Sequence, residues 1–502
     1  MRFEEIPGIL GDLLCEGIPP SWPRGEITQI EQDSRRVRAR GAVFVAIPGT
    51  SGDGRAFVED AAARGARGAL GLPQGREEAP GEVPYLAVRD PRKAVARLAA
   101  RFHDDPSHDL SVVGITGTNG KTTTTWLLQS VWEECGIRAA VSGTLGAGDP
   151  RGLIGATHTT PDAPRFQETL RGFVDHGVRA VAAEVSSHAL DQDRVYATRF
   201  RCAVFTNLTR DHLDYHGTPE AYLDAKRKLF RPEGRGDDAL CPAVVNFDDP
   251  AGRAIIEGSP DPIFGYGAAS DAFVRLERLD ARAGGLSLRV RGPRGPREIR
   301  SPLVGGFNGS NVLAAYAAAV VLGLPEDSIE RALALDVRVP GRMERIDCGQ
   351  PFLVVVDYAH TPDALARTLD ALRLIVADDG RLVVVFGCGG DRDHGKRPEM
   401  GEIAASRADR IVLTNDNPRT EDPRAILDAI SSGVRAASGV PELVEPDRAL
   451  AIRAAIGMAR EGDVILLAGK GHETYQETAA GRRDFDDRAV ARETLALLGW
   501  TR

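Results

Sequence analysis

The stretch VVGITGTNGKTTT at residues 112–124 decides the fold of this chain. Apolar residues lead into a glycine-rich turn, and Lys121 and Thr122 then open a run with helical spacing. This pattern predicts the strand, loop and helix of a phosphate-binding P-loop. Glycines let the backbone close around an anion, and the amides and the positive helix end then face that anion. We expect Lys121 to reach the β- and γ-phosphates of a nucleotide and the Thr122 hydroxyl to hold Mg²⁺.

The glycine spacing departs from the usual P-loop motif. Ile115 stands where that motif has its first glycine, and the glycines here are Gly114, Gly117 and Gly120. A chance glycine-rich turn is therefore an alternative. The Gly-Lys-Thr sequence between a predicted strand and a predicted helix favours nucleotide binding.

Composition limits the classes of protein to which the chain can belong. Its 502 residues suggest roughly three domains. A net charge of −9 argues against general binding to nucleic acid or to a membrane surface. No apolar run approaches the roughly 18 residues of a membrane span, and residues 1–5 do not resemble a signal peptide. The six cysteines show no paired spacing, so neither zinc nor a disulfide framework is indicated, and we expect a cytoplasmic protein.

The order of predicted strands and helices indicates an α/β protein with three domains. Residues 1–107 form a smaller α/β domain, with strands expected at 27–30 and 42–47 and helices at 55–64 and 91–103. Residues 108–336 form a central P-loop mononucleotide-binding domain, and residues 337–502 form a Rossmann-like domain of repeated strand–helix units.

Two polar residues follow buried strands of the central domain. Glu184 stands near the end of the strand 178–185, which is apolar except for Arg179 and Glu184, and an acid there is costly unless it is paired or bound to metal. A Mg²⁺-binding acid belongs at that position of a P-loop protein, and a structural salt bridge is the alternative. His212 follows the strand 202–207, at the same end of the sheet as Lys121. It can serve a second Mg²⁺ or a phosphate oxygen, although a lone histidine is more often structural.

Residues 218–230 predict a helix with one unusual lysine. Thr218 can cap this helix, and its apolar arc is Tyr222, Ala225, Leu229 and Phe230. Lys226 falls inside the arc. A lysine on a buried face snorkels to solvent, pairs with an acid or loses its charge. A neutral amine can also add CO₂ to give a carbamate, which is an anion able to bind Mg²⁺.

The third domain carries a polar turn after each of four predicted strands, at 352–356, 382–386, 410–413 and 464–467. Ligands of open parallel sheets bind outside the carboxyl ends of the strands. Arg392 and Arg419 suit carboxylates, and Asp416 and Glu473 suit an ammonium, so the rim matches a zwitterion. A solvated loop surface remains the alternative.

Taken together, these motifs resemble those of the Mur ligases of peptidoglycan synthesis. The matching segments are GTNGKT at 117–122, EVSSH at 184–188, the spacing from His212 to Lys226, and DYAH at 357–360. The resemblance extends from the Asp-Ser-Arg of residues 33–35 to the Gly-Lys-Gly-His-Glu of residues 469–473. It implies a UDP-binding first domain, an ATP-binding central domain and an amino-acid-binding third domain.

The resemblance also implies a set of site residues. Expected ATP contacts are Gly117, Thr118, Asn119, Gly120, Lys121, Thr122, Thr123, Asn308, Arg342 and His360, although Asn308 can also be only a helix cap. Expected contacts to UDP-MurNAc-L-Ala-D-Glu are Ser34, Thr159, Thr160, Ser186, Gln192 and Arg194; local physics alone favours a surface turn for Ser34. Expected contacts to diaminopimelate are Arg392, Asp416, Asn417, Pro418, Arg419, Gly469 and Glu473. Lys226 falls where the family carries a carbamylated lysine. The resemblance therefore implies that Mg²⁺ is bound by Thr122, Glu184, His212 and the Lys226 carbamate. The implied catalytic residues are Lys121, Lys226, Glu184 and His212.

The implied activity is ATP-dependent addition of meso-2,6-diaminopimelate to the D-Glu side-chain carboxylate of UDP-MurNAc-L-Ala-D-Glu, through an acyl phosphate. The Asp-Asn-Pro-Arg of residues 416–419 resembles the signature of the diaminopimelate-adding branch. The alternatives are the lysine-adding version, a ligase like folylpolyglutamate synthase, and a nucleotide-switched binding protein. We expect a monomer that binds no nucleic acid, does not insert into membranes and closes about linkers near residues 107 and 337.

Overall fold

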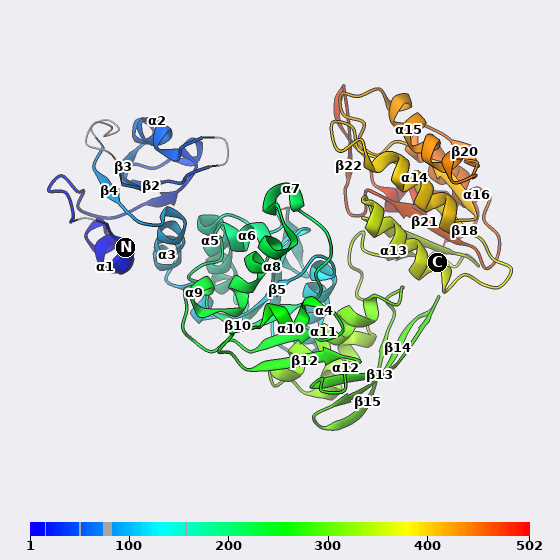
Figure 1. Cartoon of the computed structure of the whole chain (residues 1–502), viewed down its shortest axis with the longest axis horizontal. Coiled ribbons are helices and arrows are strands. Elements are labelled where there is room, and N and C mark those ends of the chain that lie inside the picture. Colours follow the sequence, from blue (N-terminus) through cyan, green and yellow to red (C-terminus); the bar gives the residue numbers. More distant parts are fainter. Residues whose placement is uncertain (16, 50–51, 74–82, 156–157, 502) are drawn as a thin grey trace. The chain divides into compact units, whose positions relative to one another are not determined.

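The computed structural model describes residues 1–15, 17–49, 52–73, 83–155 and 158–501. Its helices and strands are drawn in Figure 1, and the chain divides into two compact units. The first comprises Met1–Arg275 and Leu313–Ile329, and the second comprises Leu276–Val312 and Glu330–Arg502. Both contain parallel sheets with helices, which confirms the predicted α/β class. In the described residues, no helix is long and apolar enough to cross a bilayer.

The first unit opens with a four-stranded parallel sheet in the order β1-β2-β3-β4. Its strands are Gln29–Glu31, Ala42–Ala46, Ala66–Gly71 and Tyr85–Ala87. The main helices beside it are α1 (Ile6–Leu10), α2 (Val58–Ala63) and α3 (Pro91–Phe102). Strands β3 and β4 were not predicted, and the helix expected from residue 55 begins as a 3₁₀ turn over Gly54–Phe57. Residues 50 and 51, between β2 and this turn, lie outside the described part.

The P-loop lies in the middle of a second, mainly parallel sheet. Strand β5 (Ser111–Thr116) runs into α4 (Lys121–Glu134), as the sequence predicts. In the first unit the strand order is β12-β11-β10-β5-β9-β6-β7-β8. The strands, in sequence order, are β6 (Ala139–Gly143), β7 (Gly146–Asp149), β8 (Gly152–Ile154), β9 (Ala180–Glu184), β10 (Phe200–Phe205), β11 (Ala243–Asn246) and β12 (Ile263–Gly267). Ile115 is in register with Glu184, and Thr116 with Phe205, so three strand ends meet at one edge.

Further helices follow in this part of the chain, and α8 among them carries Lys226. They are α5 (Ala163–Asp175), α6 (Ser187–Asp191), α7 (Leu213–His216), α8 (Pro219–Arg227), α9 (Pro232–Arg235) and α10 (Ala251–Ile255). Helix α8 begins as predicted, because the Thr218 hydroxyl accepts the Ala221 amide at 3.1 Å and Pro219 needs no amide partner. A 3₁₀ turn over Lys228–Phe230 completes the predicted segment. Its apolar arc is buried, and Lys226 is buried with it.

The second unit contains a hairpin region and the Rossmann-like sheet. Strands β13 (Val274–Arg282), β14 (Gly285–Gly292) and β15 (Gly295–Ser301) follow Phe264. Helices α11 (Asn308–Val321) and α12 (Glu326–Ala334) come next, and their residues Leu313–Ile329 belong to the first unit. The sheet order is β16-β17-β21-β18-β19-β20, in which β16 is antiparallel. The six strands are Glu344–Ile346, Leu353–Asp357, Val464–Ala468, Leu382–Phe386, Arg410–Leu413 and Leu443–Val444.

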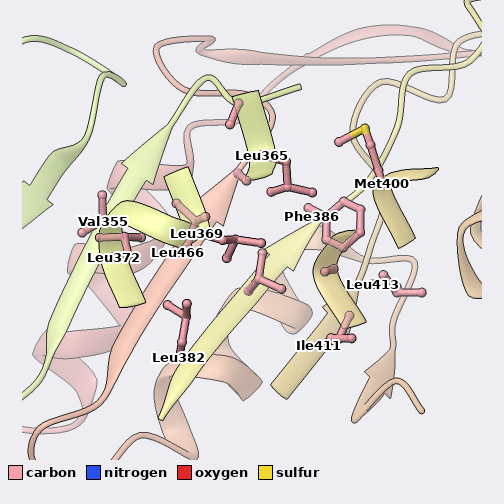
Figure 2. Packing of buried hydrophobic residues seen from close by; sticks show 14 of the residues in the cluster. Val355, Leu365, Leu369, Leu372, Leu382, Phe386, Met400, Ile411, Leu413 and Leu466 are labelled. Atoms are coloured by element: carbon pink, nitrogen blue, oxygen red, sulfur yellow. The ribbon is translucent and has the colours of Figure 1, made fainter. Parts of the chain in front are cut away.

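The core of this sheet forms because its strands are apolar on both faces, as parallel strands under helices must be. Figure 2 shows Val355, Leu382, Phe386 and Leu466 from the strands packed with Leu369 and its neighbours from the helices. The helices of the domain are α13 (Pro362–Arg373), α14 (Lys396–Arg407), α15 (Pro423–Ala436), α16 (Arg448–Gly457) and α17 (Asp487–Leu497). All four strands expected in this domain are present. A hairpin of β22 (Tyr475–Thr478) and β23 (Gly481–Asp484) was not predicted.

Candidate active site

The P-loop folds around its own lysine. Lys121 Nζ donates to the carbonyls of Gly117 and Thr118, each at 2.8 Å. Gly117 has φ near +149°, and a Cβ there would lie 1.9 Å from Thr206 Oγ1. Only glycine therefore lets the loop follow this path. The loop presents a lysine and a helix N-terminus at the same point, which is the chemistry of an anion site.

Lys226 lies against the same loop. Its side chain is 1% exposed, and its Nζ donates to Gly117 O at 3.0 Å and lies 4.4 Å from the centre of the Tyr222 ring. Among the described residues no carboxylate forms an ion pair with it. Burial, and then the charge of Lys121, hold the pKa of Lys226 well below its usual value, and Asp211 only partly opposes them. The head group thus neither snorkels nor pairs, which leaves loss of charge among the predicted alternatives.

Glu184 is held by hydrogen bonds from one residue. Its Oε1 accepts the Thr144 amide and its Oε2 accepts the Thr144 hydroxyl, both at 3.0 Å. A Cβ on Gly143 would lie 2.2 Å from Oε1, so any side chain there would displace the Glu184 carboxylate. In the part of the chain that the structure describes, Glu184 forms no salt bridge. Its carboxylate is buried without a cation, and a bound metal ion would supply one.

A cavity of about 380 Å³ opens beside Glu184. Its lining residues are Thr144, His158, Thr159, Thr160, Ser186, His188, Arg194 and His212. Burial, with the neighbouring His212 and His216, lowers the pKa of His188 to about 4, and burial also lowers the pKa of His212. Both imidazoles are therefore neutral near pH 7, and each can donate one hydrogen bond and accept another.

Four of the six residues expected to contact the muramyl dipeptide line this cavity, and Gln192 orients one of them. Arg194 Nη1 donates to Thr160 O at 2.8 Å, and its Nη2 donates to Gln192 Oε1 at 2.8 Å. Ser186 N donates to Thr160 Oγ1 at 3.1 Å. The sixth residue, Ser34, is buried and hydrogen-bonded to Asp60, and it is not among the residues that line the cavity.

The polar rim of the second unit is a connected network. Asn417 Nδ2 and Lys470 Nζ donate to Glu473 Oε2 at 2.9 and 2.8 Å, and Lys470 Nζ also donates to Asn417 Oδ1 at 3.1 Å. Asp416 is buried, and burial raises the pKa of its carboxyl despite the charges of nearby cations. A Cβ on Gly469 would lie 2.6 Å from Asp416 Oδ2. Asp416, Asn417 and Lys470 are therefore buried parts of the rim and not a solvated loop surface.

Arg419 lies at the edge of this network. Its φ of +53° is unusual for a residue with a side chain. Its Nη1 donates to Gly390 O at 2.7 Å, and Gly390 N donates to Asn417 O at 2.9 Å. The loop after β18, which also carries the exposed Arg392, is thereby hydrogen-bonded to the segment that contains Pro418.

Three expected ATP contacts also lie in the second unit. The Arg342 guanidinium lies 4.8 Å from the Tyr358 ring centre, and the His360 ring is 4.4 Å from that ring. Among the described residues the buried Arg342 Nε has no hydrogen-bond partner, which suits a polar ligand. Asn308, in contrast, donates to Val304 O at 2.7 Å and accepts from Asn311 at 2.8 Å, as a residue at a helix start does.

Sequence reasoning missed several residues of these sites. Thr144, His158 and His188 line the cavity, but no role was predicted for any of them. Thr144 was detectable from the sequence, because it directly follows the last residue of the buried strand β6, and polar turns after buried strands mark the ligand edge of such sheets. His188 stood within EVSSH and lacked only a stated role.

Models of the Mur ligase family match the chain in three regions. The description "Mur ligase family, catalytic domain" matches residues 26–103, "Mur ligase middle domain" matches 115–319, and "Mur ligase, glutamate ligase domain" matches 341–471. Together they cover more than half of the chain. The three matched ranges fall within residues 1–107, 108–336 and 337–502.

Curated relatives and solved structures agree with the family models. The UDP-N-acetylmuramoyl-L-alanyl-D-glutamate–2,6-diaminopimelate ligase of Geobacillus kaustophilus is 45% identical over 476 residues, 94% of this chain and 96% of its own. The enzyme of that name from Thermosynechococcus vestitus is 46% identical over 91% of this chain and 90% of its own. A solved structure of a ligase of that name is 34% identical, with a TM-score of 0.72 over the whole of both chains.

More distant structures share the fold alone. A folylpolyglutamate synthase of Mycobacterium tuberculosis is 19% identical, with a TM-score of 0.61 over 76% of this chain and 92% of its own. With family models matched in three regions and relatives 45–46% identical along nearly its whole length, this chain belongs to the Mur ligase family.

Proposed function

We propose that this chain is an ATP-dependent ligase that adds meso-2,6-diaminopimelate to UDP-MurNAc-L-Ala-D-Glu in peptidoglycan precursor synthesis. The observation that carries the proposal is the 44–46% identity to ligases of that name over at least 90% of both chains. The Asp-Asn-Pro-Arg segment of residues 416–419, built into a polar rim, supports diaminopimelate over lysine.

The reaction needs activation because a carboxylic acid in water gives its proton to an amine and does not condense with it. ATP would phosphorylate the D-Glu side-chain carboxylate to an acyl phosphate, releasing ADP. The diaminopimelate amine would then attack the acyl carbon, form the amide and expel orthophosphate. The main barrier to the first step is the repulsion between an anionic carboxylate and an anionic γ-phosphate. The site must therefore supply positive charge where the two anions meet.

Lys121 and the P-loop amides supply part of that charge, and the Thr122 hydroxyl, Glu184 and His212 would hold Mg²⁺. In the described residues no three His, Cys, Asp or Glu side chains are grouped to hold a metal, and two of the proposed ligands are of other types. The uncompensated Glu184 carboxylate and the buried Lys226 amine fit the ion, provided that the amine becomes a carbamate. When bound, Mg²⁺ would neutralise charge on the transferring phosphoryl group.

Carbamate formation at Lys226 suits its surroundings. The lone pair of the neutral amine attacks the carbon of CO₂, the amine proton leaves to water, and the product is an N-bound carboxylate. A lowered pKa makes the neutral amine available, and the new anion is compensated by Lys121 and by the metal ion. We propose that Lys226 acts in this form.

The two remaining substrates are assigned to separate sites. We propose that Thr159, Thr160, Ser186, Gln192 and Arg194 position the muramyl dipeptide at the cavity, and that Ser34 contacts its UDP. Arg392, Asp416, Asn417, Pro418, Arg419, Gly469 and Glu473 would position diaminopimelate. Asn308, Arg342 and His360 would complete the ATP site, with Gly117, Thr118, Asn119, Gly120 and Thr123 of the P-loop. Closure of the domains, the monomeric state and the cytoplasmic location stay predictions.

One assay separates the candidate activities. Phosphate release is measured with ATP, Mg²⁺ and UDP-MurNAc-L-Ala-D-Glu, and with diaminopimelate, lysine or neither as the amine. We expect release that depends on the dipeptide and on diaminopimelate, together with an amide product. Phosphate release that occurs with lysine but not with diaminopimelate would identify the lysine-adding activity. Release that needs neither amino acid would contradict a ligase. Following ¹⁸O from the D-Glu carboxylate into orthophosphate tests the acyl phosphate, because no other route transfers that oxygen.

A further inference from the structure

We infer that Glu477 is a positioning residue that orients Arg419 toward the distal carboxylate of diaminopimelate. The inference rests on the proposed function, because it names the residue that sets the amino-acid specificity of the same site. Glu477 lies on β22 of the unpredicted hairpin, and none of the sequence motifs included it.

Strand β22 is hydrogen-bonded to the segment that carries Arg419. Arg419 N donates to Glu477 O at 3.0 Å, and Glu477 N donates to Asn417 Oδ1 at 2.9 Å. Gln476 Nε2 donates to Asp416 O at 2.7 Å. Three residues of the proposed amino-acid site are thus held by two successive residues of one strand. These contacts explain how Arg419 keeps a left-handed φ of +53°.

The side chain of Glu477 adds a contact of its own. Its Oε2 accepts Arg419 Nε at 3.2 Å, while Arg419 Nη1 donates to Gly390 O at 2.7 Å. These two bonds hold the guanidinium from its Nε side and from one Nη atom. A guanidinium has five N–H donors, so three remain for a ligand, and Nη2 presents two of them together. A carboxylate bound in this way would be the feature that diaminopimelate has and lysine lacks.

Among the described residues, the other ion pair of the Glu477 carboxylate is weak. Its second ion pair, to Arg482, is long at 3.8 Å and is formed by a side chain that is 63% exposed. The backbone bonds to Arg419 and Asn417 persist whatever side chain stands at 477. Substitution at this position therefore removes the contact to the guanidinium and leaves the strand in place.

The test compares Glu477→Ala and Glu477→Gln with the wild-type chain in the phosphate-release assay. We expect Glu477→Ala to raise the KM for diaminopimelate by about tenfold and to change kcat by less than about twofold, because the loss is in substrate positioning. Glu477→Gln keeps an acceptor for Arg419 Nε and should recover to within about threefold of wild type. The KM values for ATP and for the muramyl dipeptide should not change.

Asp484→Asn is the matched control, because Asp484 is an exposed acid on the same hairpin and pairs in register with Tyr475. It should leave every KM unchanged. An unchanged KM for diaminopimelate in Glu477→Ala would overturn the inference. A lowered KM would also overturn it, since it would mean that Glu477 competes with the substrate for Arg419. If wild type shows no release that depends on diaminopimelate, the proposed function fails instead, so the two failures are distinguishable.

Discussion

Replacing Asp193 with asparagine should stabilise the first unit at neutral pH and lose most of that effect in acid. Asp193 stands between Gln192 and Arg194, is buried, and has a left-handed φ of +53°. In the described residues its Oδ1 has no hydrogen-bond partner. Asparagine suits this backbone conformation as well as aspartate does and does not ionise.

The magnitude follows from the pKa of the carboxyl. Burial raises the pKa of Asp193 from 3.8 to about 6, and the charges around it, Lys228, Asp90, Lys93 and Asp191, partly cancel. Such a displacement corresponds to about 3 kcal/mol, given about 1.4 kcal/mol for each pH unit. Because the folded state binds the proton more tightly, stability falls as pH rises between these two pKa values, and the full cost is present above pH 6. The uncharged amide of the variant carries no such cost.

Urea unfolding followed by tryptophan fluorescence measures this difference, since Trp22, Trp126 and Trp132 lie in the first unit and only Trp500 lies in the second. The stability gained by Asp193→Asn should be about 2 kcal/mol larger near pH 8 than near pH 4.5. Comparing the two pH values removes any constant effect of the amide. Asp238→Asn, at an exposed acid, should show no such dependence. A gain that is equal at both pH values would refute the assignment of a buried, unpaired carboxylate to Asp193.

Three further substitutions test the two units. Lys226→Ala should abolish phosphate release, and added short-chain carboxylic acids should restore part of it by replacing the carbamate. Lys226→Arg should remain inactive with the same acids. Failure of rescue in Lys226→Ala would count against the carbamate. Gly143→Ala should lower kcat/KM about 10²-fold, because its Cβ would lie 2.2 Å from Glu184 Oε1, while Gly172→Ala, with open space on α5, should not; equal activities would contradict the tight fit. Leu369→Ala should lower the free energy of unfolding of the second unit by about 2–5 kcal/mol, because Leu369 is buried. Leu374→Ala should change that free energy by less than about 0.5 kcal/mol, because Leu374 is 76% exposed. Thermal unfolding measures both.

The sequence predicted those parts of the sites that depend on periodicity and on strand ends. The P-loop was predictable because the apolar residues of β5 lead into a glycine-rich turn that ends in Gly-Lys-Thr. The burial of Lys226 followed from its angle on a helix whose other inward positions are apolar. The four strands of the third domain were evident for the same reason, since a strand covered on both faces is continuously apolar.

The missed contacts depend instead on which distant segments come together. Thr144 is an ordinary threonine until β6 pairs beside β9 and brings its amide and hydroxyl to Glu184. Glu477 lies in a short, polar strand with no hydrophobic alternation, so its pairing with Arg419 had no local signal. A motif identifies the residues that touch a ligand, because their chemistry is distinctive. The residues that hold them are defined by geometry, and ordinary side chains are sufficient for that task. Predictions of specificity made from motifs alone will therefore miss such supports, and substitutions at Thr144 and Glu477 are where that difference can be measured.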